Sequence, residues 1–458
     1  MELLNRVNKD FHDLLEQTDT VSQMKELSAA MLEKGMLMKG KPFPTFLKPY
    51  FVDLEDRKYF EYSTNMVVSS VNKVCEAYFK EGKFQEYIEF HGRLGELSKV
   101  DALYPGYQII DRLDVFFNPE NKELKYLEFN TADPSGMGWH DQLLAMFDRM
   151  PAVKALRDRY KLSADLLVKF HMRIFLRKYR QWCQAKGIKP ADKPSMAFVC
   201  WNESTILSDY YAIIEYYREA GYDAQFADPR EFDYDGHKLL LKGKHISLVY
   251  RDSMQDFLQD EFYPDCQNIL NAYRDGNVCF INPVSSAAGG FKSVMEILTD
   301  AKYAHMFTPE ENEANRMFVP WTRNFKDGAT TYGDKKVDLV AHVRDNKDLF
   351  VLKPNAGYGG FGVKIGRYSD QNDWDQYIQK IISEDVQFTV QDFVHIPQDD
   401  FPVVENGEYK GFAKKNVNIN FWSHDGEFAG CFVRAAAGSI INIHQGGGLV
   451  PVYFVSDK

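Results

Sequence analysis

The chain has 458 residues, of which 45% are hydrophobic and 26% are charged, and its formal net charge is −11. This is an ordinary globular balance with material for about two to four domains, and the acidic excess argues against nucleic acid or an anionic membrane as a partner. The six cysteines have no paired spacing and no apolar run reaches the roughly 20 residues that span a bilayer, so we expect a cytoplasmic protein without a disulfide or zinc framework.

Residues 1–100 are predicted to form mainly helices. Apolar side chains recur at helical spacing in 21–37 and again in 65–79. A connection with three prolines lies between them, over 39–50. We expect this region to be a helical layer without catalytic or binding residues.

A β-hairpin is predicted next. Its strands cover 109–117 and 124–130, and an Asn-Pro-Glu-Asn segment supplies the turn. Apolar neighbours indicate strands that are buried on both faces, where polar side chains need partners. A turn centred near Glu120 sets the pairing of the two strands.

Four polar side chains of this hairpin, those of Arg112, Asp114, Glu128 and Asn130, fall on one side of it, because side chains alternate between the faces of a strand. The predicted turn places Arg112 opposite Glu128. Oxygen ligands of these types suit Mg²⁺, and an arginine beside them suits a polyphosphate. The alternative is a solvent-exposed polar face with a cross-strand Arg–Glu pair.

Helical patterns follow over 139–184, and an α/β unit begins near 194. Its predicted strands (196–201, 224–227 and 246–250) alternate with a helix over 208–220, which indicates a parallel sheet. Groups at the carboxyl ends of such strands tend to line a ligand crevice. The candidates for substrate contact there are Asn202, Glu203, Ser204, Arg251 and Asp252. Capping of loops is the alternative.

A further short strand is predicted over 279–282. It leads through a small-residue segment into Lys292, at the start of a helix that ends near Leu298. A lysine at a glycine-rich helix entry could meet an anion at the positive helix end. It could equally be a surface lysine.

The most informative stretch covers 349–365 and reads LFVLKPNAGYGGFGVKI. A strand delivers Lys353 and Pro354 to a loop with four glycines, at 357, 359, 360 and 362. Glycine lets backbone N–H groups approach an anion closely, and the lysine adds a charge for phosphate. A Walker loop is excluded because no Gly-Lys-Ser/Thr follows, and a kinase loop because the lysine precedes the glycines. A flexible hairpin turn is the alternative.

The C-terminal part is predicted to be rich in strands. One covers 386–394, and a hairpin of 415–422 and 427–436 turns at His424-Asp425-Gly426. A last strand is expected over 450–455. Arg434 lies at an otherwise small and apolar strand end, so we expect it to be paired or functional.

Taken in order, these residues resemble a known family. Arg112-x-Asp114, Glu128-x-Asn130, Lys292, Lys353-Pro354 before a glycine loop, Gln391 on a strand and Arg434 occur together. The set is similar to the synthetase domain of glutathionylspermidine synthetase and, more widely, to the circularly permuted ATP-grasp ligases. In that group the metal-binding Glu-x-Asn precedes the lysines, as here. The resemblance covers roughly 107 to the C-terminus, and 196–252 resembles the accompanying α/β domain.

The resemblance implies a role for each position. Asp114, Glu128 and Asn130 would hold two Mg²⁺ ions. Arg112 would hold the transferring phosphoryl group, and Arg434 an acyl phosphate or the oxyanion of a tetrahedral intermediate. The ATP-binding residues would be Lys292, Lys353, the loop of Gly357, Tyr358, Gly359, Gly360 and Gly362, and the segment of Gln391, Asp392, Phe393 and Val394 at the adenine edge.

The implied fold is α/β (α+β), a permuted ATP-grasp fold. We expect a helical region at 1–100, hairpin and helices at 101–190, a pre-ATP-grasp-like domain at 191–285 and the nucleotide-binding region at 286–458. The implied activity joins a small-molecule or peptide carboxylate to an amine. Phosphoryl transfer to another acceptor, ATP hydrolysis, or nucleotide binding without catalysis are the alternatives.

Two departures limit the resemblance. The family's loop typically has a basic residue after its first glycine, where this chain has Tyr358. The cysteine amidase domain of some members is not seen in this sequence. Glutathione and spermidine therefore cannot be carried over as substrates, and the oligomeric state is not predicted.

Overall fold

The computed structural model describes residues 1–252, 257–357, 359–384, 386–441, 443 and 447–458. The first hundred residues contain the expected helices α1 (Glu2–Glu16), α2 (Thr20–Glu33), α3 (Asp56–Glu81) and α4 (Gly92–Leu97). They also contain strands β1 (Leu37–Met38), β2 (Lys41–Pro42) and β3 (Tyr50–Asp53), which the sequence did not predict. The proline-rich connection therefore contributes β-structure as well as loops.

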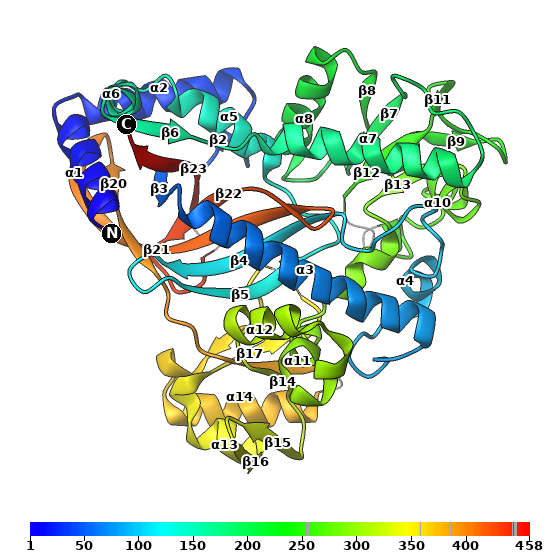
Figure 1. Ribbon diagram of the computed structural model, residues 1–458. Coiled ribbons are helices and arrows are strands. Elements are labelled where there is room, and N and C mark those ends of the chain that lie inside the picture. The colour runs from blue at the N-terminus through cyan, green and yellow to red at the C-terminus, as the bar shows by residue number, and fades with distance from the viewer. Residues whose placement is uncertain (253–256, 358, 385, 442, 444–446) are drawn as a thin grey trace.

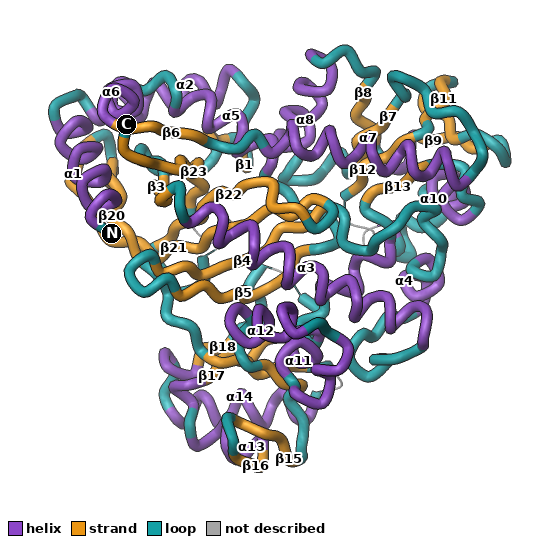
Figure 2. Tube along the Cα trace, viewed as in Figure 1, coloured by secondary structure: helices purple, strands orange, loops and turns teal. Residues whose placement is uncertain are grey.

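A large sheet forms the centre of the molecule (Figures 1 and 2). Its main path runs β3, β23 (Gly448–Asp457), β22 (Glu427–Ala436), β21 (Glu408–His424), β4 (Ile110–Asn118) and β5 (Glu123–Asn130). Strand β20 (Gln398–Glu405) also pairs with β21, and β6 (Tyr160–Ser163) with β23. Only the β23–β3 pair is parallel among these pairings of described residues.

The turn between β21 and β22 agrees with the sequence prediction. Two residues separate the strands, Asp425 and Gly426, with φ of +54° and +82°. Two positive φ angles match the right-handed twist of paired strands, and Asp-Gly is a favoured pair for this geometry. The long hairpin is therefore fixed by local sequence.

The two faces of the large sheet have different neighbours. Leu113, Val115 and Phe117 of β4 share a core with Phe60 of α3, which crosses one face (Figure 1). At one end of the other face lie α5 (Met137–Phe147), α6 (Pro151–Arg159) and α7 (Leu167–Ala185), in a core with Trp422. The alternate side chains of β4 lie on this second face, away from α3.

The α/β unit contains the predicted parallel sheet. Its order is β13 (Cys279–Ile281), β12 (Leu248–Arg251), β7 (Met196–Val199) and β8 (Ala224–Ala227), with helices α8 (Leu207–Glu219) and α10 (Gln267–Arg274). A small antiparallel sheet of β9 (Phe232–Tyr234), β10 (Leu239–Leu241) and β11 (Lys244–Ile246) follows β8 in the chain.

We call residues 291–394 the lower lobe, after their place in Figure 1. Its antiparallel sheet has the order β14 (Thr322–Asn324), β19 (Phe388–Asp392), β17 (Phe350–Pro354) and β18 (Lys364–Ile365). Around it lie α11 (Val294–Thr299), α12 (Pro309–Phe318), α13 (Leu339–Asp345), α14 (Gln371–Ser383) and the hairpin β15 (Ala329–Tyr332)–β16 (Lys335–Asp338). Phe350, Leu352 and Trp374 contribute to its separate core.

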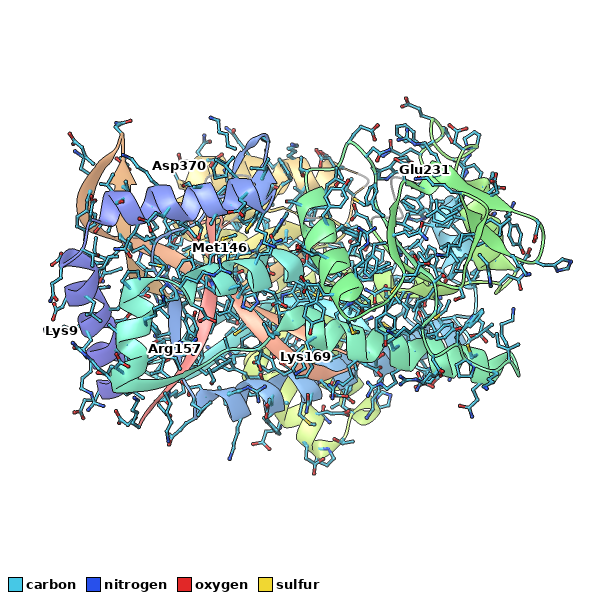
Figure 3. The ribbon with its side chains drawn as sticks, turned by 90° about the horizontal axis from the view of Figure 1, so that it is seen from above. Lys9, Met146, Arg157, Lys169, Glu231 and Asp370 are labelled. Atoms are coloured by element: carbon cyan, nitrogen blue, oxygen red, sulfur yellow. The ribbon has the colours of Figure 1, made fainter. Side chains whose placement is uncertain are left out.

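The ends of the chain meet at one side of the molecule (Figure 1). Arg6 of α1 donates to the carboxylate of Asp457 at 2.7 Å. Viewed from above in Figure 3, Lys9 on α1 and Glu231 beside β9 lie at opposite ends of the molecule. Within the described ranges, none of the helices combines the length and apolar character that crossing a bilayer requires.

Candidate active site

A cleft between the large sheet and the lower lobe brings the predicted residues together. It is lined from the sheet by Arg112, Asp114, Glu128, Asn130 and Arg434, and from the lobe by Lys292, Lys353, Gly357, Gly359, Gly360, Gln391, Asp392, Phe393 and Val394. Gly362 belongs to the same loop but packs against Pro354 instead of lining the cleft. Tyr358 lies outside the described residues.

The predicted pairing of the acidic hairpin is wrong by two residues. Arg112 lies opposite Asn130 and Asp114 opposite Glu128, whereas Arg112 was expected opposite Glu128. Two features each shift the pairing by one residue. The turn pairs Asn118 with Glu123 and so centres between 120 and 121, and a β-bulge between Asp114 and Val115 leaves Leu127 as an extra residue on β5. A shift of two residues keeps every side chain on its face, so the four polar groups still share one side.

The two hairpin carboxylates face each other and each has a cation partner. Asp114 is paired with Arg434 and also accepts from Asn130 Nδ2 at 3.3 Å. Glu128 lies 3.2 Å from the ammonium of Lys292. The pairs bring charges of both signs to the end of the cleft where the hairpin lies.

The oxygen-rich donor set fits magnesium better than a transition metal. Asp114 and Glu128 supply carboxylates and Asn130 an amide oxygen, the hard ligands that Mg²⁺ shares with substrate phosphates. Among the described residues no group of three or more His, Cys, Asp or Glu side chains could hold a metal by itself. A site completed by phosphate oxygens agrees with both observations.

Both arginines have donors to spare in this part of the cleft. Arg112 donates from Nη1 to the carbonyl of Ser135 at 2.8 Å, and Arg434 donates from Nη2 to Asn418 Oδ1 at 2.9 Å. The Nε atoms of both are buried and have no hydrogen-bond partner among the described residues. Burial, followed by the charge of Arg434, lowers the pKa of Arg112. Two such cations favour a polyanion between them.

The two lysines reach the cleft from different elements. Lys353, on β17, donates to Gln391 Oε1 at 2.6 Å, and burial lowers its pKa to about 8. Lys292 is 6% exposed and donates to the carbonyl of Gly357 at 2.8 Å. It lies two residues before α11, which has only 6 residues. Its charge is therefore held by the glycine loop and Glu128, and the helix end adds little.

The glycine loop needs its glycines for backbone conformation and for close contact. Gly359, Gly360 and Gly362 have φ of +70°, +76° and +70°, values that L side chains rarely adopt. A Cβ on Gly360 would lie 2.6 Å from Cγ2 of Ile440. The loop therefore touches the segment after β22, from which Ser439, Ile440 and Ile441 also line the cleft.

The part of the cleft beside β19 is mainly apolar. Its lining includes Leu127, Val351, Ile365, Phe393 and Ile396, which suits a flat ring. The backbone N–H groups of 392 and 393 already donate to carbonyls of 321 and 349. The edge of an adenine ring could therefore contact only the backbone N–H of 394 or the backbone carbonyls of this segment. This is a smaller set of backbone groups than the predicted contact over 391–394.

Sequence reasoning missed Asn418, which lines the cleft and holds Arg434. A buried neighbour fixes it in turn, since Asn420 Nδ2 donates to Asn418 Oδ1 at 2.6 Å. The signal was present in the alternating asparagines of KNVNINFW, which place 416, 418 and 420 on one face of β21.

The five candidates at the parallel sheet do not line this cleft. Arg251 is buried and donates to the carbonyls of Asn282 and Pro283 at 3.1 and 3.2 Å. The backbone N–H of Asn202 donates to Asp228. Capping of loops, the alternative interpretation, accounts for these contacts.

Comparisons with known proteins place the fold. No family model and no curated protein matches the sequence. The structure is similar to that of a glutathione synthetase like-effector (GSS30) from Globodera pallida, with a TM-score of 0.63 and 12% identity over 95% of this chain and 97% of that one. A Methylobacillus flagellatus protein, named as a candidate gamma-glutamylcysteine synthetase, matches at 12% identity over 91% of this chain and 90% of that one, with a TM-score of 0.43.

The chain thus has a mixed α/β fold shared, over nearly its whole length, with a glutathione synthetase-like protein. The mixed α/β class agrees with the sequence prediction, whereas the ATP-grasp fold in particular stays a prediction. An identity of 12% establishes likeness of fold alone. Circular permutation, the domain boundaries and the resemblance to glutathionylspermidine synthetase in particular stay predictions.

Proposed function

We propose that the protein is an ATP-dependent carboxylate–amine ligase that forms an amide through an acyl phosphate. The observation that carries the proposal is the convergence, in one cleft, of an acidic hairpin, two lysines, a glycine loop and two arginines from opposite parts of the chain. A triphosphate with its metal ions needs fixed charges of both signs, and few other small ligands do.

In this proposal Asp114, Glu128 and Asn130 hold two Mg²⁺ ions. The ions would neutralise charge on the β- and γ-phosphates and orient them for in-line attack. Lys292 and Lys353 contact the phosphates, and the apolar lining beside β19 receives the adenine. The carboxylates would exchange their present partners, Arg434 and Lys292, for the metal ions.

The reaction then has two steps. A carboxylate oxygen of the substrate attacks the γ-phosphorus, the bond to the β-phosphate oxygen breaks, and ADP and an acyl phosphate form. The nitrogen of an amine attacks the acyl carbon, loses a proton and expels phosphate, which leaves the amide. Arg112 stabilises the transferring phosphoryl group and Arg434 the oxyanion, because both reactions concentrate negative charge that fixed cations stabilise more in the transition state.

Exclusion of water matters because water would hydrolyse the acyl phosphate. The loop of Gly357 to Gly362 and the segment 439–441 contact each other through Gly360 and Ile440. Both segments line the cleft, so together they would cover a ligand bound in it. We expect them to stay closed until the amine has reacted.

The test is incubation of the protein with Mg·ATP and separate pools of carboxylates and amines. Amide product formed with one ADP per bond supports the ligase. Release of ADP that does not depend on an amine would instead identify phosphoryl transfer or hydrolysis. Nucleotide binding without turnover in any pool would indicate a non-catalytic protein.

A further inference from the structure

A second polar pocket lies at the edge of the lower lobe, beside the edge strand β14, where two residues from outside the lobe complete its lining. Its lining comes from four places in the chain: Glu86 and Tyr87; Glu296, Asp300 and Lys302; Arg323 and Asn324; and residues 326–331 with Leu339. Among the described residues it shares no lining residue with the cleft. Any ligand here would bind separately from the nucleotide.

Arg323 is the central feature of this pocket. It is 6% exposed, and neutral oxygens hold its guanidinium. Nε donates to Thr330 Oγ1 at 3.1 Å, and Nη1 donates to the Thr322 carbonyl at 2.7 Å and to Thr299 Oγ1 at 3.3 Å. The ring of Trp321 lies 4.9 Å from the guanidinium carbon. These contacts fix the orientation of the Arg323 guanidinium without neutralising its charge.

The charge of Arg323 has no direct counter-ion in the part of the chain that the structure describes. No carboxylate there lies within 4.0 Å of it, and its Nη2 makes no hydrogen bond to those residues. A buried cation is costly unless an anion pairs with it. A ligand anion at Nη2 would supply that pairing.

The other charges of the pocket compensate one another only in part. Lys302 lies 3.2 Å from Asp300 and 3.6 Å from Glu296, and Lys326 lies 3.6 Å from Glu86. Glu296 also accepts from the hydroxyl of Tyr87 at 3.2 Å. One lysine cannot neutralise both Asp300 and Glu296, and the charge of Arg323 also acts on the buried Glu296. Among the described residues, two groups stay available to a ligand: the Nη2 donor of Arg323 and the carboxylate of Asp327, which has no ion pair there.

We propose that this pocket binds a small zwitterion of the α-amino acid type. The ligand carboxylate pairs with Nη2 of Arg323, and its ammonium lies toward Asp327 at the rim. A simple anion would leave Asp327 unpaired in a pocket of four carboxylates and three cations, and a simple cation would leave Nη2 of Arg323 without an acceptor. The proposal concerns a site apart from the cleft and holds whether or not the protein is a ligase.

Calorimetric titration of the full, nucleotide-free chain tests the site. The probes are the common α-amino acids, one at a time. Acetate, which has only the carboxylate, and methylammonium, which has only the ammonium, serve as single-charge probes. At least one amino acid should bind, and acetate and methylammonium should each bind at least about tenfold more weakly. The proposal is overturned if no amino acid binds at millimolar concentration, or if acetate binds as well as the best of them.

Variants then locate the binding. Arg323→Gln should weaken it at least about tenfold, and Asp327→Asn, at an exposed side chain, about threefold or more. Arg344→Gln, at an exposed arginine on α13, is the matched control and should leave it unchanged. Loss of binding in Arg434→Gln with retention in Arg323→Gln would place the ligand in the cleft and refute the proposal. If Arg323→Gln does not fold, Asp327→Asn decides.

Discussion

At the scale of single residues, the cleft is organised by exchangeable ion pairs. Asp114 pairs with Arg434, and Glu128 with Lys292. An unpaired buried charge costs several kcal/mol, so these pairs keep the carboxylates and cations in place. A magnesium nucleotide carries both signs and, bound as proposed, would replace both partners at once, so the cleft would stay stable and still receive its ligand.

The role proposed for Glu128 predicts a selective loss of activity. Glu128→Ala should lower turnover at least about 100-fold by removing a metal ligand. The fold should persist, since Lys292 keeps its bond to the Gly357 carbonyl. Glu123→Ala, at the exposed first residue of the same strand, is the control. Wild-type ADP release by Glu128→Ala would remove this residue from the metal site.

The lowered pKa of Lys353 predicts how nucleotide affinity depends on pH. Its pKa is about 8 because burial disfavours the ammonium. Only the ammonium attracts phosphate, so the dissociation constant for ATP should be flat below pH 8. Above that pH it should rise by up to about tenfold per unit.

Titrations of ATP binding between pH 6 and pH 9.5 measure this dependence. Lys353→Arg keeps its charge throughout and should flatten the profile. An unchanged slope in that variant would assign the titration to another group. For folding the sign is opposite: the unfolded chain binds the proton more tightly between pH 8 and about 10.4, so this residue makes the fold relatively more stable as pH rises through that window.

At the scale of elements, the glycine loop depends on its glycines in two ways. They adopt positive φ angles, and they leave room for the neighbouring segment at Ile440. Gly360→Ala should cost about 1 kcal/mol of unfolding free energy because φ is positive. It should also weaken ATP binding roughly fivefold, since the new Cβ meets Ile440.

Gly407→Ala is the matched control, with φ of +78° and no atom within 4 Å of the added Cβ. It should lose similar stability but bind ATP normally. Denaturant unfolding and nucleotide titration of both variants separate the two effects. Equal loss of ATP affinity in the two variants would mean that the contact with Ile440 has no part in binding.

At the scale of the whole molecule, the site exists because distant segments converge. Hydrogen exchange should slow on addition of Mg·ADP at both 124–130 and 359–363, because one ligand would contact the hairpin and the loop. Residues 232–246, in the small sheet beyond the parallel one, serve as an internal reference and should not change. Protection of only one of the two segments would contradict a shared nucleotide.

Much of this architecture could be predicted because it depends on local sequence. The hairpin turn at Asp425-Gly426, the strand of 427–436 and the parallel strand of 224–227 agree with their predicted bounds, since turn chemistry and strand periodicity act between near neighbours. The same alternation placed Arg112, Asp114, Glu128 and Asn130 on one face, which is why those side chains could be named before their surroundings were known.

What only the tertiary structure decided is which distant segments pair and in what register. Nothing local marks 50–53 as a strand beside β23, because its pairing partner lies about four hundred residues away in the chain. The bulge after Asp114 shifted the hairpin register by one further residue, and the place of Asn418 beneath Arg434 depends on β21 pairing with β4 and β22 together. Local sequence therefore determined the strands and their polar faces, whereas long-range packing determined how those faces enclose a cleft.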